Sequence, residues 1–125
     1  MWRLLLIIGT GSFLGGVSRF LLSRLVQNMF LSSFPYGTFA VNILGSLLIG
    51  FLYGLSVKEN ILTTEWRMFL TVGFCGSFTT FSTFIHENVA LLRDGDFFHF
   101  AFYTGLSIFL GIIAVFLGHY ITKMI

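Results

Sequence analysis

The chain consists of four long stretches of mostly apolar residues separated by short polar links. A helix needs about 20 mostly apolar residues to cross the hydrocarbon core of a bilayer, and each stretch reaches that length. The pattern therefore predicts an all-α membrane protein with four transmembrane helices. The stretches run from Trp2 to Val26, from Tyr36 to Val57, from Glu65 to Leu92 and from Phe97 to Ile121.

Local signals support three of the expected helix starts. Pro35 precedes the second stretch, and Thr63 and Thr64 are candidate N-caps for the third, because these residue types favour the first turn of a helix. Asp94-Gly95-Asp96 opens the fourth stretch. The short links predict a compact bundle, a single domain over residues 1–125. The links run roughly over Gln27–Pro35, Lys58–Thr64 and Arg93–Asp96.

The third stretch is unusual in its polar content. Its residues 73–84, GFCGSFTTFSTF, hold two glycines, five hydroxyl side chains and four phenylalanines within an otherwise apolar span. In lipid, non-helical backbone survives only where protein or a polar cavity surrounds it. Glycines followed by clustered Ser and Thr therefore predict a helix that is broken in mid-membrane and lines a path for a polar solute.

A polar stripe follows the second stretch. Thr38, Asn42 and Ser46 are spaced four residues apart, which places them on one face of a helix. One interpretation is that they bond to other helices, since Asn and Ser often connect membrane helices. The matching polar cluster of the third stretch favours the other interpretation, a shared polar path.

The phenylalanines of the third stretch share a helix face at spacings of three, at Phe78, Phe81 and Phe84. An aromatic stripe that faces lipid or the protein core is the ordinary explanation for such spacing. A phenyl ring has a positive edge, so ring edges can also line an anion's path without a full charge that would trap it. Interleaved hydroxyls favour the path, and these are Thr79, Thr80, Ser82 and Thr83.

Few charged residues fall at membrane depth, where they are costly and usually functional. Arg19 lies toward the end of the first stretch, where it either extends to the membrane interface or attracts anions in a vestibule. Glu87 opposes anion entry unless it is paired, and Arg19 and Arg93 are the candidate partners. Tyr103 and Ser107, one turn apart in the fourth stretch, are expected to face the same path.

Composition agrees with a membrane protein and excludes several function classes. The 125 residues are 56% hydrophobic and 10% charged, against about 25% charged residues in soluble domains. The net charge of +2 comes without a basic run, so nucleic acid is not an expected partner.

The single cysteine, Cys75, excludes a disulfide within one chain. No spacing suggests nucleophilic or metal catalysis, so an enzyme is not expected. The first apolar run lacks a cleavage signal and is expected to remain as a helix.

The charges that orient a membrane protein are almost balanced. Four spans place both termini on one side, with four Lys and Arg residues there and three on the other side. Since Lys and Arg asymmetry sets orientation, this chain is expected to insert in both directions and to form antiparallel dimers. The two sets are Arg3, Lys58, Arg67 and Lys123, and Arg19, Arg24 and Arg93.

Three motifs resemble those of the Fluc (CrcB) fluoride channels, and the resemblance extends over the whole chain. They are Gly15-Gly16-x-x-Arg19-Phe20, Gly37-Thr38-Phe39-Ala40-Val41-Asn42-x-x-Gly45-Ser46, and the third-stretch motif given above. Two positions depart from the family pattern, which often has tyrosine in place of Phe20 and serine in place of Gly111.

The resemblance implies a passive fluoride channel in the inner (plasma) membrane, an antiparallel homodimer with two pores at its interface. It implies that Phe81, Phe84 and Asn42 line the pore. It also implies a structural sodium ion at the dimer centre, held by the main-chain carbonyls of Gly76 and Thr79. The other candidate pore residues are Thr38, Thr80, Ser82, Tyr103, Ser107 and Arg19.

Two other functions are weighed against the channel. A small proton-coupled multidrug exporter also has four short spans, but it needs a membrane-embedded carboxylate, and the first stretch contains no Asp or Glu. A structural subunit without transport activity explains four spans but not the polar third stretch.

Overall fold

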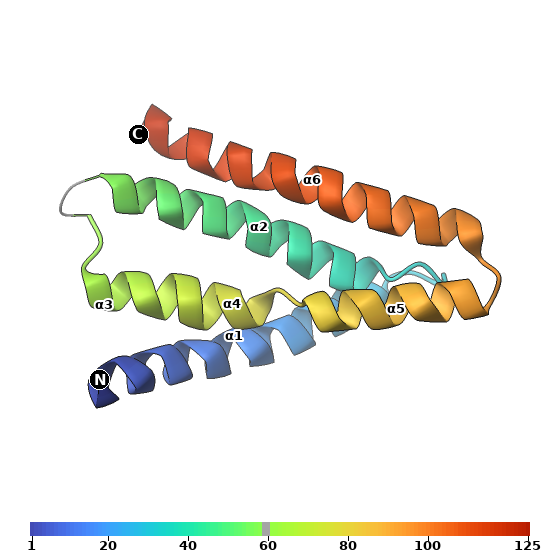
Figure 1. Ribbon diagram of the computed structural model, residues 1–125, viewed down its shortest axis with the longest axis horizontal. Coiled ribbons are helices and arrows are strands. Elements are labelled where there is room, and N and C mark those ends of the chain that lie inside the picture. Colours follow the sequence, from blue (N-terminus) through green and yellow to red (C-terminus); the bar gives the residue numbers. More distant parts are fainter. Residues whose placement is uncertain (59–60) are drawn as a thin grey trace.

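The computed structural model describes residues 1–58 and 61–125, so two residues of the expected link Lys58–Thr64 lie outside the described residues. Every regular element within the described ranges is helical. Four helical segments are long and apolar enough to cross a membrane, which confirms the prediction from the sequence. They are α1 (Trp2–Asn28), α2 (Tyr36–Val57), a third segment over Thr64–Arg93, and α6 (Phe97–Met124) (Figure 1).

The third segment is not one regular helix. Two extended residues, Thr79 (φ −90°, ψ 157°) and Thr80 (φ −146°, ψ 118°), separate its halves. The first half also contains a π-helix, a form whose wider turns are rare and frequently occur at functional sites. The elements are α3 (Thr64–Arg67), the π-helix η1 (Met68–Cys75), α4 (Gly76–Phe78) and α5 (Phe81–Arg93).

The helices form two packed pairs in an elongated bundle. α2 packs chiefly against α6, and α1 packs against η1 and α4 (Figure 1). Both termini lie at one end of the bundle, and the connections from α1 to α2 and from α5 to α6 lie at the other (Figure 1). The interruption in the third segment therefore falls between α1 on one side and α2 on the other.

Glycines allow the paired helices to approach closely. A Cβ atom at Gly118 of α6 would overlap the Leu47 carbonyl oxygen of α2, and one at Gly15 of α1 would overlap the Phe74 carbonyl oxygen of η1. Because lipid is as apolar as the helices themselves, their association depends on close van der Waals packing. These glycines therefore fix the distance between the helices that surround the interruption.

A buried aromatic cluster closes the bundle at the end away from the termini. Phe34, from the α1–α2 connection, packs against Tyr103 of α6 with ring centroids 5.4 Å apart. Tyr103 in turn packs against Phe84 of α5 at 4.9 Å. All three side chains are buried together with Leu91. The cluster therefore ties the connection to the helices that follow the interruption.

Side-chain caps define two helix starts that the sequence predicts. The Thr63 hydroxyl accepts a hydrogen bond from the Trp66 N–H. Asp96 caps α6 by accepting from the His99 N–H, after a turn in which Gly95 has a positive φ of 72°. The hydrogen bond from the His99 side chain is the main cause that lowers the pKa of Asp96 below its ordinary value. These caps satisfy N–H groups that have no partner within their helices.

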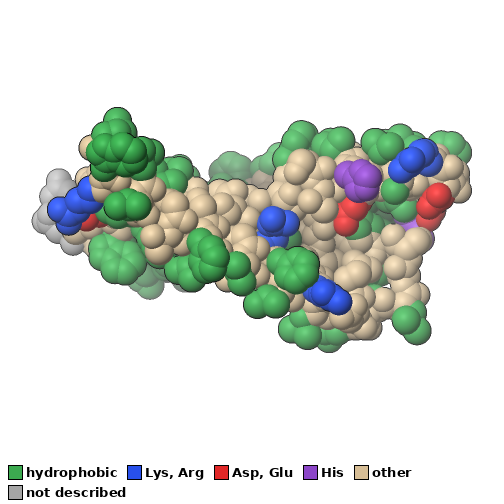
Figure 2. All heavy atoms as spheres, turned by 90° about the horizontal axis from the view of Figure 1, so that it is seen from below, with side chains coloured by type: hydrophobic (Ala, Val, Ile, Leu, Met, Phe, Trp, Pro, Cys, Tyr) green, Lys and Arg blue, Asp and Glu red, His purple; other side chains and the backbone are tan. Residues whose placement is uncertain are grey.

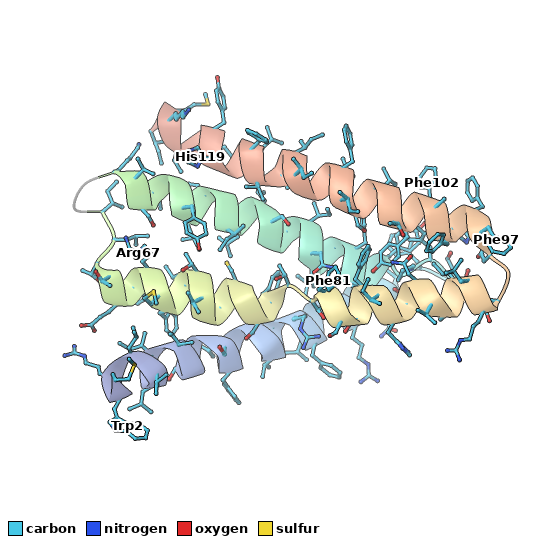
Figure 3. All side chains as sticks on the ribbon, viewed as in Figure 1. Trp2, Arg67, Phe81, Phe97, Phe102 and His119 are labelled. Carbon is cyan, nitrogen blue, oxygen red and sulfur yellow. The ribbon has the colours of Figure 1, made fainter. Side chains whose placement is uncertain are left out.

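The outer surface is apolar, as a membrane environment requires. Hydrophobic side chains project along the whole length of the face in Figure 2. Large side chains such as Phe13, Phe116 and Leu21 are each at least 60% exposed. Figure 3 places Phe81 near the middle of the length, between Trp2 toward one end and Phe97 at the other. The interruption at residues 79–80 therefore lies far from both ends.

We expect Gly118→Ala to lower the free energy of unfolding by about 1–3 kcal/mol, the usual cost of overpacking. The added methyl group meets the α2 backbone, which cannot move without separating α2 from α6. Thermal unfolding in detergent measures the effect. Gly105→Ala is the matched control, because a Cβ atom at Gly105 of the same helix meets open space. Equal melting temperatures for the two variants would contradict the packing argument.

Candidate functional site

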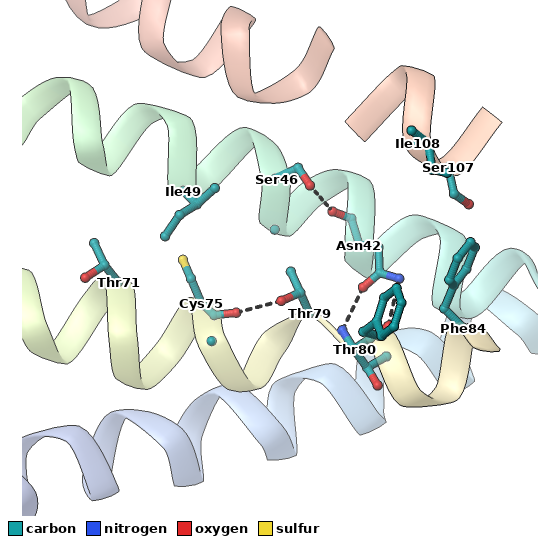
Figure 4. A pocket seen from close by; sticks show the side chains of 13 residues that line it. Asn42, Ser46, Ile49, Thr71, Cys75, Thr79, Thr80, Phe84, Ser107 and Ile108 are labelled. Carbon is teal, nitrogen blue, oxygen red and sulfur yellow. Dashed lines mark hydrogen bonds between the residues drawn. The ribbon is translucent and has the colours of Figure 1, made fainter. Parts of the chain in front are cut away.

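A groove of about 400 Å³ lies beside the interruption of the third segment. Its walls come from α2, η1, α4, the extended residues, the start of α5 and the middle of α6 (Figure 4). None of the side chains that line it carries a formal charge. They are Asn42, Gly45, Ser46, Ile49, Thr71, Cys75, Gly76, Thr79, Thr80, Phe81, Phe84, Ser107 and Ile108.

Asn42 holds the extended backbone in place with two hydrogen bonds. Its Oδ1 atom accepts from the Thr80 N–H at 2.8 Å, and its Nδ2 atom donates to the Thr80 carbonyl oxygen at 3.1 Å (Figure 4). A single amide thus satisfies both polar groups of one residue that has left the helix. Such satisfaction is required at membrane depth, where no water replaces a missing partner.

The interruption redirects the N–H groups that two carbonyls would otherwise bind. In a continuous helix, the Thr80 N–H would bond to the Gly76 carbonyl and the Thr83 N–H to the Thr79 carbonyl. Here the first donates to Asn42, and the second donates to the Thr80 hydroxyl at 3.3 Å. Gly76 and Thr79 therefore lose their ordinary helical donors, and both line the groove.

Arg19 contacts the interruption from the opposite side. Its Nε atom donates to the Ser77 carbonyl oxygen at 3.0 Å. Ser77 belongs to the last turn before the extended residues, where carbonyls lack helical partners. α1 and α2 thus each contribute one side chain that binds the backbone of the interrupted segment.

The two phenylalanines at the start of α5 lie in different environments. Phe81 is 75% exposed and Phe84 is 7% exposed, with ring centroids 6.1 Å apart. Both line the groove. The Phe81 ring thus forms part of the open wall, whereas the Phe84 ring joins the groove to the buried cluster around Tyr103.

One hydroxyl in the groove has no protein partner. Among the described residues, the Ser107 Oγ atom is the buried side-chain oxygen or nitrogen without a hydrogen bond. The Ser46 hydroxyl, which also lines the groove, instead donates to the main-chain carbonyl oxygen of Asn42 at 2.7 Å. Because buried polar groups are usually paired, the Ser107 hydroxyl is a donor and acceptor that remains available in the groove.

Glu87 is held by hydroxyl groups. Its two carboxylate oxygens accept from the Thr38 hydroxyl and from the Tyr103 hydroxyl, each at 2.9 Å. In the described ranges, the salt bridges involve other carboxylates, so neither Arg19 nor Arg93 is its partner. The carboxylate therefore joins α2, α5 and α6 rather than forming an ion pair.

The structure brings most of the candidate residues to the groove, but not all of them. Thr38 and Tyr103 meet at Glu87 instead. Ser82 is exposed on α5 and does not line the groove. Arg19 also lies outside the lining. Those that line the groove are Asn42, Thr80, Phe81, Phe84 and Ser107, with Gly76 and Thr79 of the expected cation site.

Besides apolar side chains of the walls, the sequence interpretation did not place Thr71 and Cys75 in the groove. Thr71 and Cys75 precede Thr79 at steps of four and face the groove with it. The same spacing rule that identified the stripe on the second stretch was sufficient to find them. Asn88 was also missed, a buried residue that donates to the Phe84 carbonyl oxygen at 3.0 Å and accepts from Thr104.

The chemistry of the groove is that of neutral donors and acceptors. In residues 1–58 and 61–125, no group of three or more His, Cys, Asp or Glu side chains is placed to hold a metal ion. Hydroxyl protons, an amide and ring edges are available for an anion, and backbone carbonyls are available for a hard cation.

Comparison with known proteins gives a consistent result. The family described as "CrcB-like protein, Camphor Resistance (CrcB)" matches residues 6–119. A protein of Bacteroides fragilis named fluoride-specific ion channel FluC is 50% identical over 114 residues, 89% of each chain. Proteins of the same name are 47% identical in Chlorobium luteolum, over 90% of this chain and 87% of the relative, and 41% identical in Campylobacter jejuni, over 98% and 100%.

We expect Asn42→Leu, which keeps the branched shape and the number of heavy atoms but removes both hydrogen bonds, to lower the free energy of unfolding. The Thr80 N–H and carbonyl are left without this partner, and an unsatisfied buried group costs about 1–3 kcal/mol. Thermal unfolding in detergent measures the loss. Asn28→Leu is the control, because Asn28 is an exposed residue at the end of α1. If Asn28→Leu lost as much stability as Asn42→Leu, the loss would not come from the two hydrogen bonds between Asn42 and Thr80.

Proposed function

This chain belongs to the CrcB-like family, and we propose that it is a passive fluoride channel whose conduction path includes the groove beside residues 79–80. It is a multi-pass membrane protein, and it is not an enzyme. The observation that carries the path is the lining itself, in which hydroxyl, amide and phenyl groups meet without a formal charge. The choice of fluoride as the anion rests on the names of the relatives.

Fluoride is small and strongly hydrated, so a path must replace its water with other donors. The Ser107 hydroxyl has no protein partner and is free to donate. The second proton of the Asn42 amide is a further donor, because only one proton is used on the Thr80 carbonyl. The edges of Phe81 and Phe84 provide weaker positive surface between such donors.

The groove of one chain forms one wall of the proposed pore. Phe81 is 75% exposed and Gly76 is exposed, although both line the groove. A second copy packed over this face would cover both. We infer an antiparallel, dual-topology homodimer with two pores, which agrees with the almost even number of Lys and Arg residues at the two ends.

The interruption is proposed to lie at mid-membrane and at the dimer centre. There the carbonyls of Gly76 and Thr79, whose helical donors are directed to Asn42 and Thr80, would hold a sodium ion. Carbonyl oxygens suit a hard cation, and two chains would supply four of them. The bound cation would stabilise the dimer and offset the charge of nearby anions.

A proton-coupled drug exporter is not favoured. α1 contains no Asp or Glu, and both oxygens of Glu87 already accept hydroxyl protons from Thr38 and Tyr103. The groove carries no carboxylate that would bind a cationic drug.

Efflux from liposomes tests the proposed function directly. We expect vesicles that contain the purified protein and potassium fluoride to release fluoride when a potassium ionophore is added, without a pH gradient. A fluoride electrode records the release, and protein-free vesicles are the control. No release from protein shown to be folded would overturn the proposal, and a requirement for a pH gradient would favour an exporter.

Replacement of the groove phenylalanines tests the path. We expect Phe81→Ile and Phe84→Ile each to lower fluoride flux by at least about tenfold, because isoleucine removes the positive ring edge but keeps an apolar side chain. Phe116→Ile on α6 is the matched control, since Phe116 is 72% exposed and does not line the groove. Flux in the groove variants equal to that of the control would remove the rings from the path.

A further inference from the structure

We propose that Arg19 is a positioning residue, which holds the interrupted helix through the Ser77 carbonyl oxygen rather than attracting anions with its charge. The proposal rests on the proposed function only for its transport readout. The contact itself, from Nε to the carbonyl oxygen at 3.0 Å, is independent of what the protein conducts.

The Ser77 carbonyl needs a partner from outside its own helix. Its usual donor would be the N–H of Phe81, four residues later. Phe81 is the first residue of α5, and two extended residues separate it from α4. The last carbonyls of a helix also form the negative end of its dipole, which a cation stabilises. Arg19 supplies a charged donor at this position.

The packing of α1 brings Arg19 to this carbonyl. Gly15 lies one turn before Arg19 and packs against the Phe74 carbonyl so closely that no Cβ atom fits. Phe74 lies three residues before Ser77, so the two residues are neighbours on the surface of the same segment. The close approach at Gly15 therefore continues along α1 to the next turn, where the Arg19 side chain reaches the helix end.

Arg19 and Asn42 together bind the backbone on both sides of the interruption. Arg19 binds the carbonyl of Ser77, and Asn42 binds both polar groups of Thr80. In the sequence, Gly76 directly precedes Ser77, and Thr79 directly precedes Thr80. Both Gly76 and Thr79 line the groove. Release of Ser77 would therefore disturb the groove wall without removing any group that lines it.

Two substitutions separate the hydrogen bond from the charge. Glutamine places an amide nitrogen at the same number of bonds from Cα as the arginine Nε, so Arg19→Gln keeps the donor and removes the charge. Methionine places a methyl group there, so Arg19→Met removes both. If Arg19 positions the helix, Arg19→Gln keeps fluoride flux within about threefold of the original protein, whereas Arg19→Met lowers it by about tenfold or more.

An anion-attracting role predicts a different pattern. Both variants would then lose flux equally, and the flux of the original protein would fall with ionic strength in a way that both variants lack. Arg24→Gln and Arg24→Met are the matched controls, because Arg24 is an exposed residue of the same helix whose guanidinium lies 5.8 Å from the centre of the Phe20 ring. Equal loss of flux in both Arg19 variants and both Arg24 variants would show a general effect of charge on α1 and would contradict the positioning role.

A spectroscopic readout tests the bond without transport. Labelling serine carbonyls with ¹³C and phenylalanine nitrogens with ¹⁵N selects the Ser–Phe pairs 12–13, 33–34 and 77–78 in solid-state NMR of the protein in lipid. We expect the 77–78 carbonyl signal to move upfield in Arg19→Met and to stay in place in Arg19→Gln, while the other two pairs serve as references. An unmoved signal in Arg19→Met would overturn the proposal.

The two proposals fail in distinguishable ways. If the original protein releases no fluoride, the proposed function is wrong, and the carbonyl signals still decide whether Arg19 holds Ser77. If Arg19→Met does not fold, Arg19→Gln alone is decisive. Retained flux and an unmoved Ser77 carbonyl signal in Arg19→Gln support positioning. Lost flux with an unmoved signal in this variant contradicts it.

Discussion

The structure depends on one requirement of the bilayer, that no backbone polar group remains without a partner. Two residues leave the helix at Thr79 and Thr80, and the amide of Asn42 satisfies both polar groups of Thr80. This pairing makes a neutral groove at the interruption tolerable. The interruption also leaves the carbonyls of Gly76 and Thr79 without their helical donors, because these donors bind Asn42 and the Thr80 hydroxyl instead.

Close packing supports that pairing, because an amide reaches the neighbouring backbone only if the helices stand near each other. Glycines provide the closeness on both sides. Gly45 lets α2 meet Phe78 and Thr79 of the third segment, and Gly15 lets α1 meet the same segment from the other side. The pairing within this membrane-spanning segment thus rests on close van der Waals contacts between backbones, since the hydrophobic effect gives no force between helices in lipid.

The sequence was sufficient for the four long helices, because each apolar stretch exceeds the length that spans a bilayer. The caps at Thr63 and Asp96 follow from local residue types. The partners of Glu87 and Arg19 did not follow from the sequence. Glu87 binds two hydroxyls rather than an arginine, and Arg19 binds a carbonyl. Both pairings depend on how helices distant in sequence are packed. The residues at which the third helix is interrupted depend on Asn42 for the same reason.

These two pairings share a consequence for the proposed pore. A formal charge that faces a path would bind an anion too tightly or exclude it, and conduction needs sites that are favourable to enter but weak enough to leave. Glu87 accepts hydrogen bonds from Thr38 and Tyr103, and Arg19 donates to Ser77, a neighbour of the lining residue Gly76. Neither charged side chain lines the groove. The groove keeps hydroxyl, amide and ring groups whose partial charges attract an anion weakly. The same hydrogen bonds that connect the helices therefore keep the formal charges out of the groove.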